Sequence, residues 1–580
     1  MGHGRERVAR SVSIENLFAP SPQSLSAGVV RGAEFRRIEA IPRRLSPTID
    51  PAKLTTYLKL PAGTMALRPN QAEVLADLYD FGGAFGMQGV GSGKTLISLL
   101  APVVMEAKRP VLLVPASLKY KTEAVDIPFY RQHWRLHPDL RVVSNQTLQT
   151  LNNKDLLKRF MPDLLILDEA HEYRNRKAAR TRRLLGYLKD NPDTKLLVLS
   201  GTLTKRSIQD YWHLLKHALP RQCPLPLHWQ ELVEWSEALD QDMPENRRRA
   251  PGALMRFCGP GENVRQGFRR RLVETPGVVA TVESSCDSSL NVTQRKTPML
   301  PAVIVQAFDK MRRTASTPSG DELTDQMNVW RRCKELAYGF YYRWIWPNNK
   351  PDDEWLEARR AWRKFVRKTL EHNRRGLDSE KAVRDAVARG EITCDEYGPW
   401  VNVRERWKPH PPREAVWVSD YLLADAATWM VEHKSIVWVE HDAVGKRLAQ
   451  LTGHPYFGAG DDRIANHQGP AVVSVNAHGK GHNLQRYTNM LMLCCPSGGD
   501  VWEQLLGRSH RQGQEADEVN YSVYLHCREL WGAFQKAAGD ARYIEDSMGQ
   551  KQKLNLATIS VLTPDQVAGM SASGDPLWAG

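Results

Sequence analysis

The sequence is poor in cysteine and has no long hydrophobic run. Its 580 residues include eight cysteines, none in a C-x-x-C spacing, so neither a zinc site nor a disulfide framework is expected. No apolar stretch approaches the roughly 18 residues that span a membrane, which excludes a transmembrane protein. The N-terminal segment carries arginines but lacks the apolar core of a secretion signal. We therefore expect a protein of the reducing cytoplasm, in a bacterium or a phage-infected host cell.

Basic residues outnumber acidic ones, 80 to 66, which gives a formal net charge of +14. A hydrophobic content of 42% is ordinary for globular proteins and excludes a disordered chain. The length allows two or three domains. The basic excess favours an anionic partner, and clustered arginines favour phosphate groups over a membrane surface. A basic chain can also be merely soluble, so the charge alone does not identify the partner and the sequence motifs are needed for that.

A glycine-rich segment at residues 89–95 has the composition of a phosphate-binding loop. It reads Gly-Val-Gly-Ser-Gly-Lys-Thr and lies between an apolar segment and an apolar, helix-like run. A strand, a glycine-rich loop and a helix N-terminus in series direct several backbone N–H groups and the helix dipole toward a site that can bind an anion. Lys94 is expected to contact the β- and γ-phosphates, and Thr95 to bind Mg²⁺. The strict pattern requires glycine at position 88, where this sequence has Gln88.

Residues 164–171 form a continuous apolar run that ends in two carboxylates, Asp168 and Glu169. Such a run is typical of a buried parallel strand, whose C-terminal end borders the ligand crevice of an α/β sheet. We expect Asp168 to hold the Mg²⁺ bound by Thr95, and Glu169 to orient or deprotonate the attacking water. Together with Lys94, these residues predict a site that hydrolyses ATP with Mg²⁺.

Near the C-terminus, residues 504–514 present Arg508 and Arg511 three positions apart, introduced by a glycine. Fixed, planar cations supplied by an opposing domain stabilise a hydrolysing phosphate. The same string could be the solvated start of a basic helix. The phosphate-binding loop and the carboxylate pair upstream favour the catalytic interpretation.

In their order along the chain, these motifs resemble those of superfamily 2 helicases, and within them the Snf2-like translocases, over about residues 60–560. Motif V, at residues 476–484, departs from the Snf2 form. The family has Gly-Gly where this sequence has His478-Gly479, and leucine where it has His482. The similar segments are 67–71 (adenine recognition), 89–95 (motif I), 114–118 (Ia), 145–148 (Ib), 168–171 (II), 199–202 (III), 435–440 (IV), 476–484 (V) and 504–514 (VI).

The resemblance implies three groups of functional residues. The residues expected to bind the nucleotide are Arg68, Gln71, Gly89, Gly91, Gly93, Lys94, Thr95 and Gly481. Those expected to act in catalysis are Lys94, Asp168, Glu169, Gln504, Arg508 and Arg511. Those expected to contact the nucleic-acid backbone are Pro115, Ser117, Lys119, Thr147 and Asn483.

Short apolar strands alternate with helical segments after residue 67 and again after residue 431, which is typical of parallel sheets wrapped by helices. We therefore expect an α/β fold of two RecA-like lobes in tandem, with largely helical insertions between motifs III and IV. The expected division is 1–60, an N-terminal arm; 61–300, the first lobe, with a helical insertion at about 205–265; 301–430, a helical protrusion of the second lobe; 431–560, the second lobe with a brace helix; and 561–580, a tail.

A helix is expected within the protrusion, at residues 352–375. Its apolar stripe, which includes Trp355 and Trp362, is interpreted as packing rather than base stacking. Six cations without an interleaved acid follow between residues 359 and 368 and repel one another. A phosphate partner would relieve that repulsion, although a solvated helix face is the ordinary alternative. The candidate DNA contacts on this face are Arg359, Arg363, Lys364 and Arg367.

The motifs favour an ATP-dependent translocase or remodelling motor on duplex DNA, which couples hydrolysis between two lobes to movement. A strand-separating DNA helicase of phage or bacterial replication, recombination or repair, acting on forked or branched DNA, is the nearest alternative. An RNA helicase shares motif II. A nucleic-acid-binding scaffold with a vestigial ATPase is a further alternative, although the intact Lys94, Asp168, Glu169 and Arg511 argue against it. No protein partner is indicated.

Overall fold

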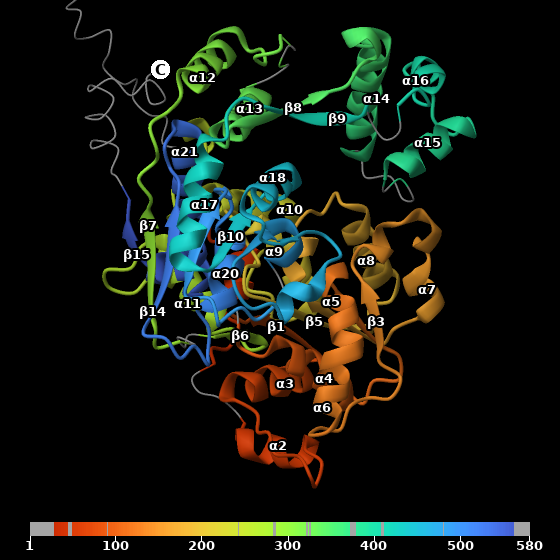
Figure 1. The fold of residues 1–580 in the computed structure, drawn as a ribbon. Helices are drawn as coiled ribbons and strands as arrows, with labels where there is room; N and C mark the ends of the chain where they lie inside the picture. The colour runs from red at the N-terminus through yellow and green to blue at the C-terminus, as the bar shows by residue number, and fades with distance from the viewer. Residues whose placement is uncertain are drawn as a thin grey trace, which may run out of the picture.

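The chain folds around two parallel β-sheets, as the α/β prediction requires (Figure 1). Within the part of the chain that is described, no helix is long and apolar enough to cross a membrane. The computed structural model describes residues 28–44, 49–89, 91–241, 243–281, 286–320, 323, 326–371, 377, 379–407, 411–479 and 481–561.

The first sheet has six strands, and every neighbouring pair is parallel. In sheet order these are β3 (Arg141–Ser144), β2 (Pro110–Val114), β4 (Leu164–Asp168), β5 (Lys195–Ser200), β1 (Gly83–Met87) and β6 (Val278–Ala280). Alternate residues of one strand face opposite sides. Leu165 and Leu167 of β4 therefore join one hydrophobic core, and Leu164 and Ile166 join another. A sheet buried on both faces explains the uninterrupted apolar runs in the sequence.

Helices cover both faces of this sheet. Those whose buried residues pack into the core with Leu165 are α1 (Ala33–Glu39), α7 (Leu156–Phe160), α8 (Ala179–Asp190), α9 (Gln209–Ala218), α10 (Trp229–Leu239) and α11 (Val264–Val273). Those in the other core are α2 (Pro51–Leu58), α3 (Pro69–Phe81) and α4 (Lys94–Val104). The short α5 (Ala116–Lys121) and α6 (Ile127–Arg131) flank them, joined by a π-helical turn at Thr122–Asp126.

The described part of the expected N-terminal arm belongs to the first lobe. Phe35 and Ile38 of α1 are buried in its core, and the Phe35 ring stacks on Phe257 with centroids 4.9 Å apart. Residues 1–27 and 45–48 of the arm, and 562–580 of the expected tail, lie outside the described residues.

The second sheet has seven strands, again all parallel. In sheet order they are β11 (Tyr456–Phe457), β12 (Ala471–Ser474), β10 (Ile436–Val439), β13 (Asn489–Leu493), β14 (Glu518–Val523), β7 (Ser289–Gln294) and β15 (Thr558–Ser560). The chain passes between the sheets after Ala280 and before Ser289, ahead of the expected boundary at residue 300. Strand β7 pairs with β14 over six residues, so residues 289–294 belong to the second lobe.

One large core unites the second sheet with its helices. These are α12 (Ala302–Thr314), α13 (Gln326–Ala337), α17 (Tyr421–His433), α18 (Asp442–Thr452), α19 (Val475–His478), α20 (Gly499–Ser509), α21 (Arg528–Met548) and α22 (Lys553–Leu556). Helix α21 also reaches the first lobe, because Met548 is buried in its core and Arg269 donates to the Glu545 carbonyl at 3.1 Å. The segment expected to be a brace therefore contacts both lobes.

A smaller unit projects from the second lobe on an antiparallel pair of strands (Figure 1). It consists of β8 (Phe340–Trp344), α14 (Asp353–Glu371), α15 (Glu380–Ala388), α16 (Tyr397–Val403) and β9 (Arg413–Trp417). Trp355 and Trp362 of α14 are fully buried in two small cores. The prediction that its aromatic stripe packs is confirmed, although the insertion also contains strands.

Candidate nucleotide site between the lobes

The phosphate-binding loop follows strand β1 and leads directly into helix α4. Gly91 and Gly93 have φ angles of 89° and 84°, a region that favours glycine. A Cβ on Gly93 would also lie 2.1 Å from the Gln71 side-chain nitrogen. The glycines thus let the loop turn tightly into the helix N-terminus, which is the geometry that binds a phosphate group.

Gln88, where the strict motif has glycine, anchors the loop. Its side chain is fully buried and donates to the Val279 carbonyl at 3.2 Å. Its side-chain oxygen Oε1 accepts from Asn70 at 2.7 Å and from the Thr281 hydroxyl at 2.6 Å. This departure from the motif therefore ties the loop to α3 and to the end of β6.

Lys94 and the two carboxylates lie together at the end of β4. The Lys94 Nζ donates to the carbonyls of Gln88 and Gly89, at 3.2 Å each, and lies 3.7 Å from a Glu169 carboxylate oxygen. Burial, followed by the charge of Glu169, raises the pKa of Asp168 to about 7, against the opposing effect of Lys94. Two buried carboxylates beside a lysine, with Thr95 next to that lysine in the chain, form a donor set that fits Mg²⁺ with a triphosphate.

Glu169 is connected to motif III through His171. The residue adopts a left-handed backbone conformation with φ of 56°, which re-aims its side chain after the strand. The His171 Nδ1 lies 3.2 Å from Glu169 Oε2 and 3.3 Å from the Ser200 hydroxyl. Ser200 in turn accepts from the Thr202 backbone N–H at 3.2 Å. The sequence identified both motifs but not this link.

Arg68 and Gln71 contact the loop itself. The Gln71 amide donates to the Ser92 carbonyl at 3.2 Å and accepts from the Arg68 backbone N–H at 3.0 Å. The Arg68 guanidinium donates to the Gly91 carbonyl at 3.1 Å and to the side chain of Gln512 in the second lobe. Base recognition by Gln71 stays a prediction, because its amide is bonded to the loop here.

Helix α20 carries Arg508 of motif VI in its last turn, and Arg511 follows in the turn after the helix. Arg508 is buried and donates to the Gln504 carbonyl at 2.9 Å and the His482 carbonyl at 3.1 Å. Burial, then the charge of Arg511, lowers the Arg508 pKa to about 10, and Glu169 opposes them. Burial and then Arg68 lower the pKa of Arg511, whose guanidinium makes no hydrogen bond or ion pair within the described residues. Gln504 and His482 thus orient Arg508, while Arg511 is available to an anion.

Ion pairs join the lobes beside this site. Asp500, in the first turn of α20, lies 2.7 Å from Arg174 and 3.2 Å from Lys205, both of the first lobe. Burial would raise the Asp500 pKa, but Arg174 and then Lys205 outweigh it and bring the pKa to about 2. Arg206 pairs with Asp540 of α21 at 2.5 Å. Sequence reasoning missed these pairs, since each joins segments roughly 300 residues apart.

The expected nucleic-acid contacts of motifs Ia, Ib and V fall in different environments. Ser117 and Asn483 are exposed, whereas Pro115 is buried before α5. Lys119 lies 3.5 Å from Glu123, and the Thr147 hydroxyl is 2.7 Å from that of Ser144.

Motifs Ia and V nevertheless face each other across the lobes. Gly481, with a φ of 94°, is so close to Leu118 that an added Cβ would lie 2.7 Å from its side chain. Gly481 thus lies at a close contact between the lobes, and its expected role in nucleotide binding stays a prediction.

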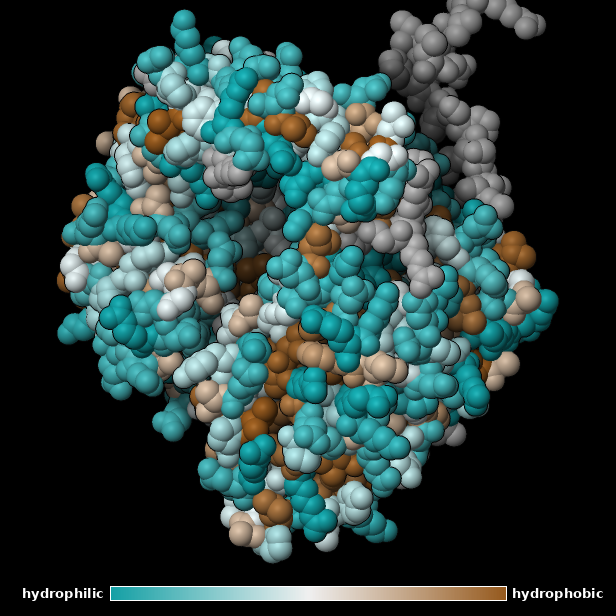
Figure 2. Space-filling view, turned by 90° about the vertical axis from the view of Figure 1, so that its right-hand side faces the viewer, coloured by the Kyte–Doolittle hydropathy of each residue, from teal (hydrophilic) through white to brown (hydrophobic). Residues whose placement is uncertain are grey.

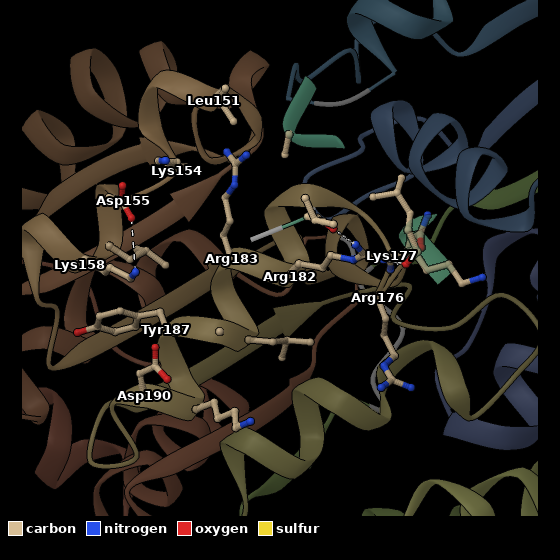
Figure 3. Close-up of a pocket in the computed structure, with 18 of the residues that line it drawn as sticks. Leu151, Lys154, Asp155, Lys158, Arg176, Lys177, Arg182, Arg183, Tyr187 and Asp190 are labelled. Carbon is tan, nitrogen blue, oxygen red and sulfur yellow. Dashed lines mark hydrogen bonds and ion pairs between the residues drawn. The ribbon is translucent and has the colours of Figure 1, made fainter. Parts of the chain in front are cut away.

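A cavity of about 1400 Å³ lies between the first lobe and the projecting unit (Figure 3). The side of the molecule on which α7, α8 and α15 lie has a mostly hydrophilic surface (Figure 2). Arg182 spans the cavity, donating to the Leu377 carbonyl at 2.6 Å. The cavity is lined by fewer acidic than basic residues. The acidic ones are Asp155, Asp190, Asp210, Asp385 and Glu391. The cations that line it are Lys154, Lys158, Arg174, Arg176, Lys177, Arg182, Arg183, Lys189, Lys205 and Arg389.

The expected basic face of α14 does not line this cavity. Arg363, Lys364 and Arg367 are exposed on the helix. Arg359 instead lies over the Trp355 ring, 4.8 Å from its centroid, and burial lowers its pKa to about 10. The sequence pattern therefore grouped one packed arginine with three exposed cations.

Comparison with known protein families identifies a domain within the first lobe. Residues 126–259 match the family model of the SNF2-related domain, a segment that contains motifs II and III. A search of curated proteins finds none that matches the chain. Proteins with this domain are ATP-dependent motors that generally act on nucleic acid. This match, together with the two parallel-sheet lobes, supports the resemblance of the chain to the Snf2-like proteins of superfamily 2.

Proposed function

We propose that this protein is an ATP-dependent translocase on double-stranded DNA. The observation that carries the proposal is the arrangement of two features around the same pair of lobes. Lys94, Asp168 and Glu169 of the first lobe face Arg508 and Arg511 of the second, and the basic cavity lies between the first lobe and the unit that projects from the second. Movement between the lobes would therefore change both the nucleotide site and the cavity.

The side chains have complementary roles in this proposal. Bound ATP–Mg²⁺ supplies the phosphoanhydride whose hydrolysis drives the cycle. Lys94, bonded to two loop carbonyls here, exchanges them for phosphate oxygens, while Thr95 and Asp168 hold the cation. Glu169, positioned beside His171, accepts a proton from the attacking water. Arg511 brings its charge to the phosphate when the lobes close.

Several observations support duplex DNA as the track. Ten cations and five acids line the cavity, which lies between the first lobe and the unit projecting from the second, so a polyanion held there would contact both. Ser117 of motif Ia and Asn483 of motif V are exposed and lie close to Leu118 and Gly481, where the lobes approach each other. The projecting unit also carries exposed cations on α14, outside the cavity.

The experiment that tests this function compares ATP hydrolysis by the full chain without polymer and with single-stranded DNA, duplex DNA, forked DNA or RNA. Duplex DNA is expected to stimulate hydrolysis at least as strongly as forked DNA, because movement along a duplex requires no fork. Stimulation by forked or single-stranded DNA alone would favour the strand-separating helicase, and stimulation by RNA alone would favour an RNA helicase. Absence of hydrolysis under every condition would indicate a binding scaffold.

A further inference from the structure

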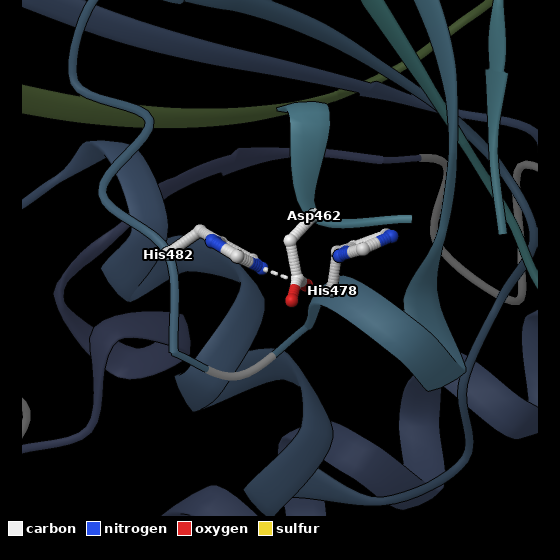
Figure 4. Close-up of side chains that lie close together, drawn as sticks. All are labelled: Asp462, His478 and His482. Atoms are coloured by element: carbon white, nitrogen blue, oxygen red, sulfur yellow. Dashed lines mark ion pairs between the residues drawn. The ribbon is translucent and has the colours of Figure 1, made fainter. Parts of the chain in front are cut away.

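Three side chains with metal-binding groups converge in the second lobe, and two of them belong to the motif V residues that depart from the Snf2 pattern. Asp462 begins the 3₁₀ turn η9 (Asp462–Ala465), His478 ends α19, and His482 follows in the loop. One potential ligand atom from each lies within 4.8 Å of the other two. Figure 4 shows a ring nitrogen of each histidine directed toward the Asp462 carboxylate.

The hydrogen bonds of His478 leave one ring nitrogen free to bind a metal. Its Nε2 lies 2.9 Å from the Gly458 carbonyl, which can only accept, so Nε2 carries the proton and Nδ1 the lone pair. Nδ1 is buried and has no hydrogen-bond partner within the described residues. A buried acceptor without a partner is uncommon and costs free energy. A carbonyl behind the opposite nitrogen is also the usual support of a metal-bound histidine.

We infer that Asp462, His478 and His482 form a site for a divalent transition metal, and that Zn²⁺ fits it best. Two ligands, each about 2.0–2.1 Å from a tetrahedral Zn²⁺, are separated by about 3.3 Å. His482 Nε2 and Asp462 Oδ1 already lie 3.3 Å apart. The other distances between ligand atoms are at most 4.8 Å, so His478 would have to move only modestly toward the other two on metal binding. Two imidazoles and a carboxylate are a common zinc ligand set, with the fourth position open to water.

The cluster is open to solvent on one side. The His478 ring is buried, and the His482 side chain is 16% exposed. The Asp462 side chain is 73% exposed, so an ion reaches the cluster from solvent. The neighbouring Asp461 is paired with Arg463 at 2.7 Å and does not compete for the same position.

The site adjoins the catalytic arginine. The His482 carbonyl accepts a hydrogen bond from Arg508 at 3.1 Å, and the Leu484 backbone N–H donates to the Arg508 carbonyl at 3.0 Å. A metal on the His482 ring would restrain this loop and, through it, the orientation of Arg508. This second step rests on the proposed ATPase function, whereas metal binding itself does not.

The test is Zn²⁺ binding by the full chain, freed of any affinity tag and dialysed against chelator, followed by calorimetry. Wild-type protein is expected to bind one Zn²⁺ at this site. Asp462→Asn and His482→Ala, both at accessible positions, should weaken that binding by at least about 100-fold, since loss of an outer-shell partner alone costs 10–100-fold. Asp461→Asn is the matched control and should bind as wild type does.

Cobalt substitution gives a second readout. Co²⁺ in this site is expected to produce the visible absorption of a four-coordinate ion, which His482→Ala should abolish. Equal Zn²⁺ binding by wild type, Asp462→Asn and His482→Ala would overturn the assignment, as would no binding by folded wild type. Unchanged hydrolysis on addition of Zn²⁺, with binding intact, would remove the link to Arg508 and leave the metal site standing.

Discussion

Arg174 of the first lobe and Asp500 of the second form an ion pair of 2.7 Å beside the nucleotide site. Arg174 follows motif II by three residues, and Asp500 lies in the first turn of the helix that carries Arg508. The pair therefore links the segment that follows Asp168 and Glu169 to the helix that carries Arg508. Lys205 and the Arg206–Asp540 pair extend this connection to the segment after motif III.

Replacement of Asp500 by asparagine is expected to destabilise the protein by about 2 kcal/mol at neutral pH, since one pKa unit corresponds to 1.36 kcal/mol. The folded-state pKa of Asp500 is depressed from 3.8 to about 2. Its stabilisation is therefore present above about pH 4 and is lost as the pH falls toward 2. Thermal unfolding of both proteins should show a constant difference from pH 8 to pH 5 and a smaller one at pH 3.5. Asp517→Asn, an exposed carboxylate, serves as control, and a difference that grows in acid would contradict the account.

Gln88→Gly would restore the strict phosphate-loop motif, yet we expect it to weaken the protein. The change removes the hydrogen bonds to Asn70, Val279 and Thr281 and leaves those groups buried or partly buried without their partner. An unsatisfied buried group costs about 1–3 kcal/mol. Denaturation and ATP-binding measurements should show lower stability and weaker nucleotide binding. Equal or greater stability in the glycine variant would show that Gln88 does not anchor the loop.

Lys94→Ala and Glu169→Gln are both expected to stop hydrolysis, but for different reasons. Lys94 is placed to hold phosphate oxygens in the ground and transition states, whereas Glu169 serves the water. The lysine variant should therefore bind ATP poorly. The glutamine variant should bind ATP normally while turnover falls by about 10²–10⁴. Binding titration and steady-state hydrolysis distinguish the two, and normal turnover in either would remove the active-site assignment.

Cations of the cavity and of α14 give separate predictions for DNA binding. Each lost phosphate contact lowers the slope of log affinity against log salt by about 0.9 on duplex DNA, alike for all sequences. Lys154→Ala with Lys189→Ala, at exposed positions of the cavity rim, should lower the slope by nearly two. Arg363, Lys364 and Arg367 changed together to alanine should lower it further if α14 also contacts DNA. An unchanged slope in a folded variant would identify that surface as ordinary solvated side chains.

The sequence predicted those features that local pattern encodes. Apolar runs such as residues 164–168 predict buried parallel strands, and the glycine-rich segment with its lysine and threonine predicts a phosphate-binding loop. The alternating, half-polar strand Ser289–Gln294 carries a weaker signal, so its membership of the second sheet could not be recognised before its pairing partner was known.

Other features depend on contacts between distant segments. In the sequence, Gln88 is only a departure from motif I. Its anchoring role could not be predicted, because its partners Val279 and Thr281 are about 190 residues away. His478 and His482 appeared to be departures in motif V, since their relation to Asp462 arises only when the turn after β11 folds against α19. The cysteine spacing indicated no zinc site, and the site that we infer consists of histidine and aspartate instead.

The measurement that tests the central claim most directly is ATP-driven displacement of the third strand from a DNA triplex, which requires movement along the duplex but no unwinding. Wild-type protein is expected to displace the strand. Arg511→Ala should hydrolyse ATP about 10³–10⁵ times more slowly and fail to displace it, while binding duplex DNA and ATP nearly as wild type does. Arg511→Lys should not rescue, because an ammonium group lacks the planar fork of the guanidinium. If wild-type protein hydrolyses ATP on duplex DNA yet never displaces the third strand, the translocase account is wrong.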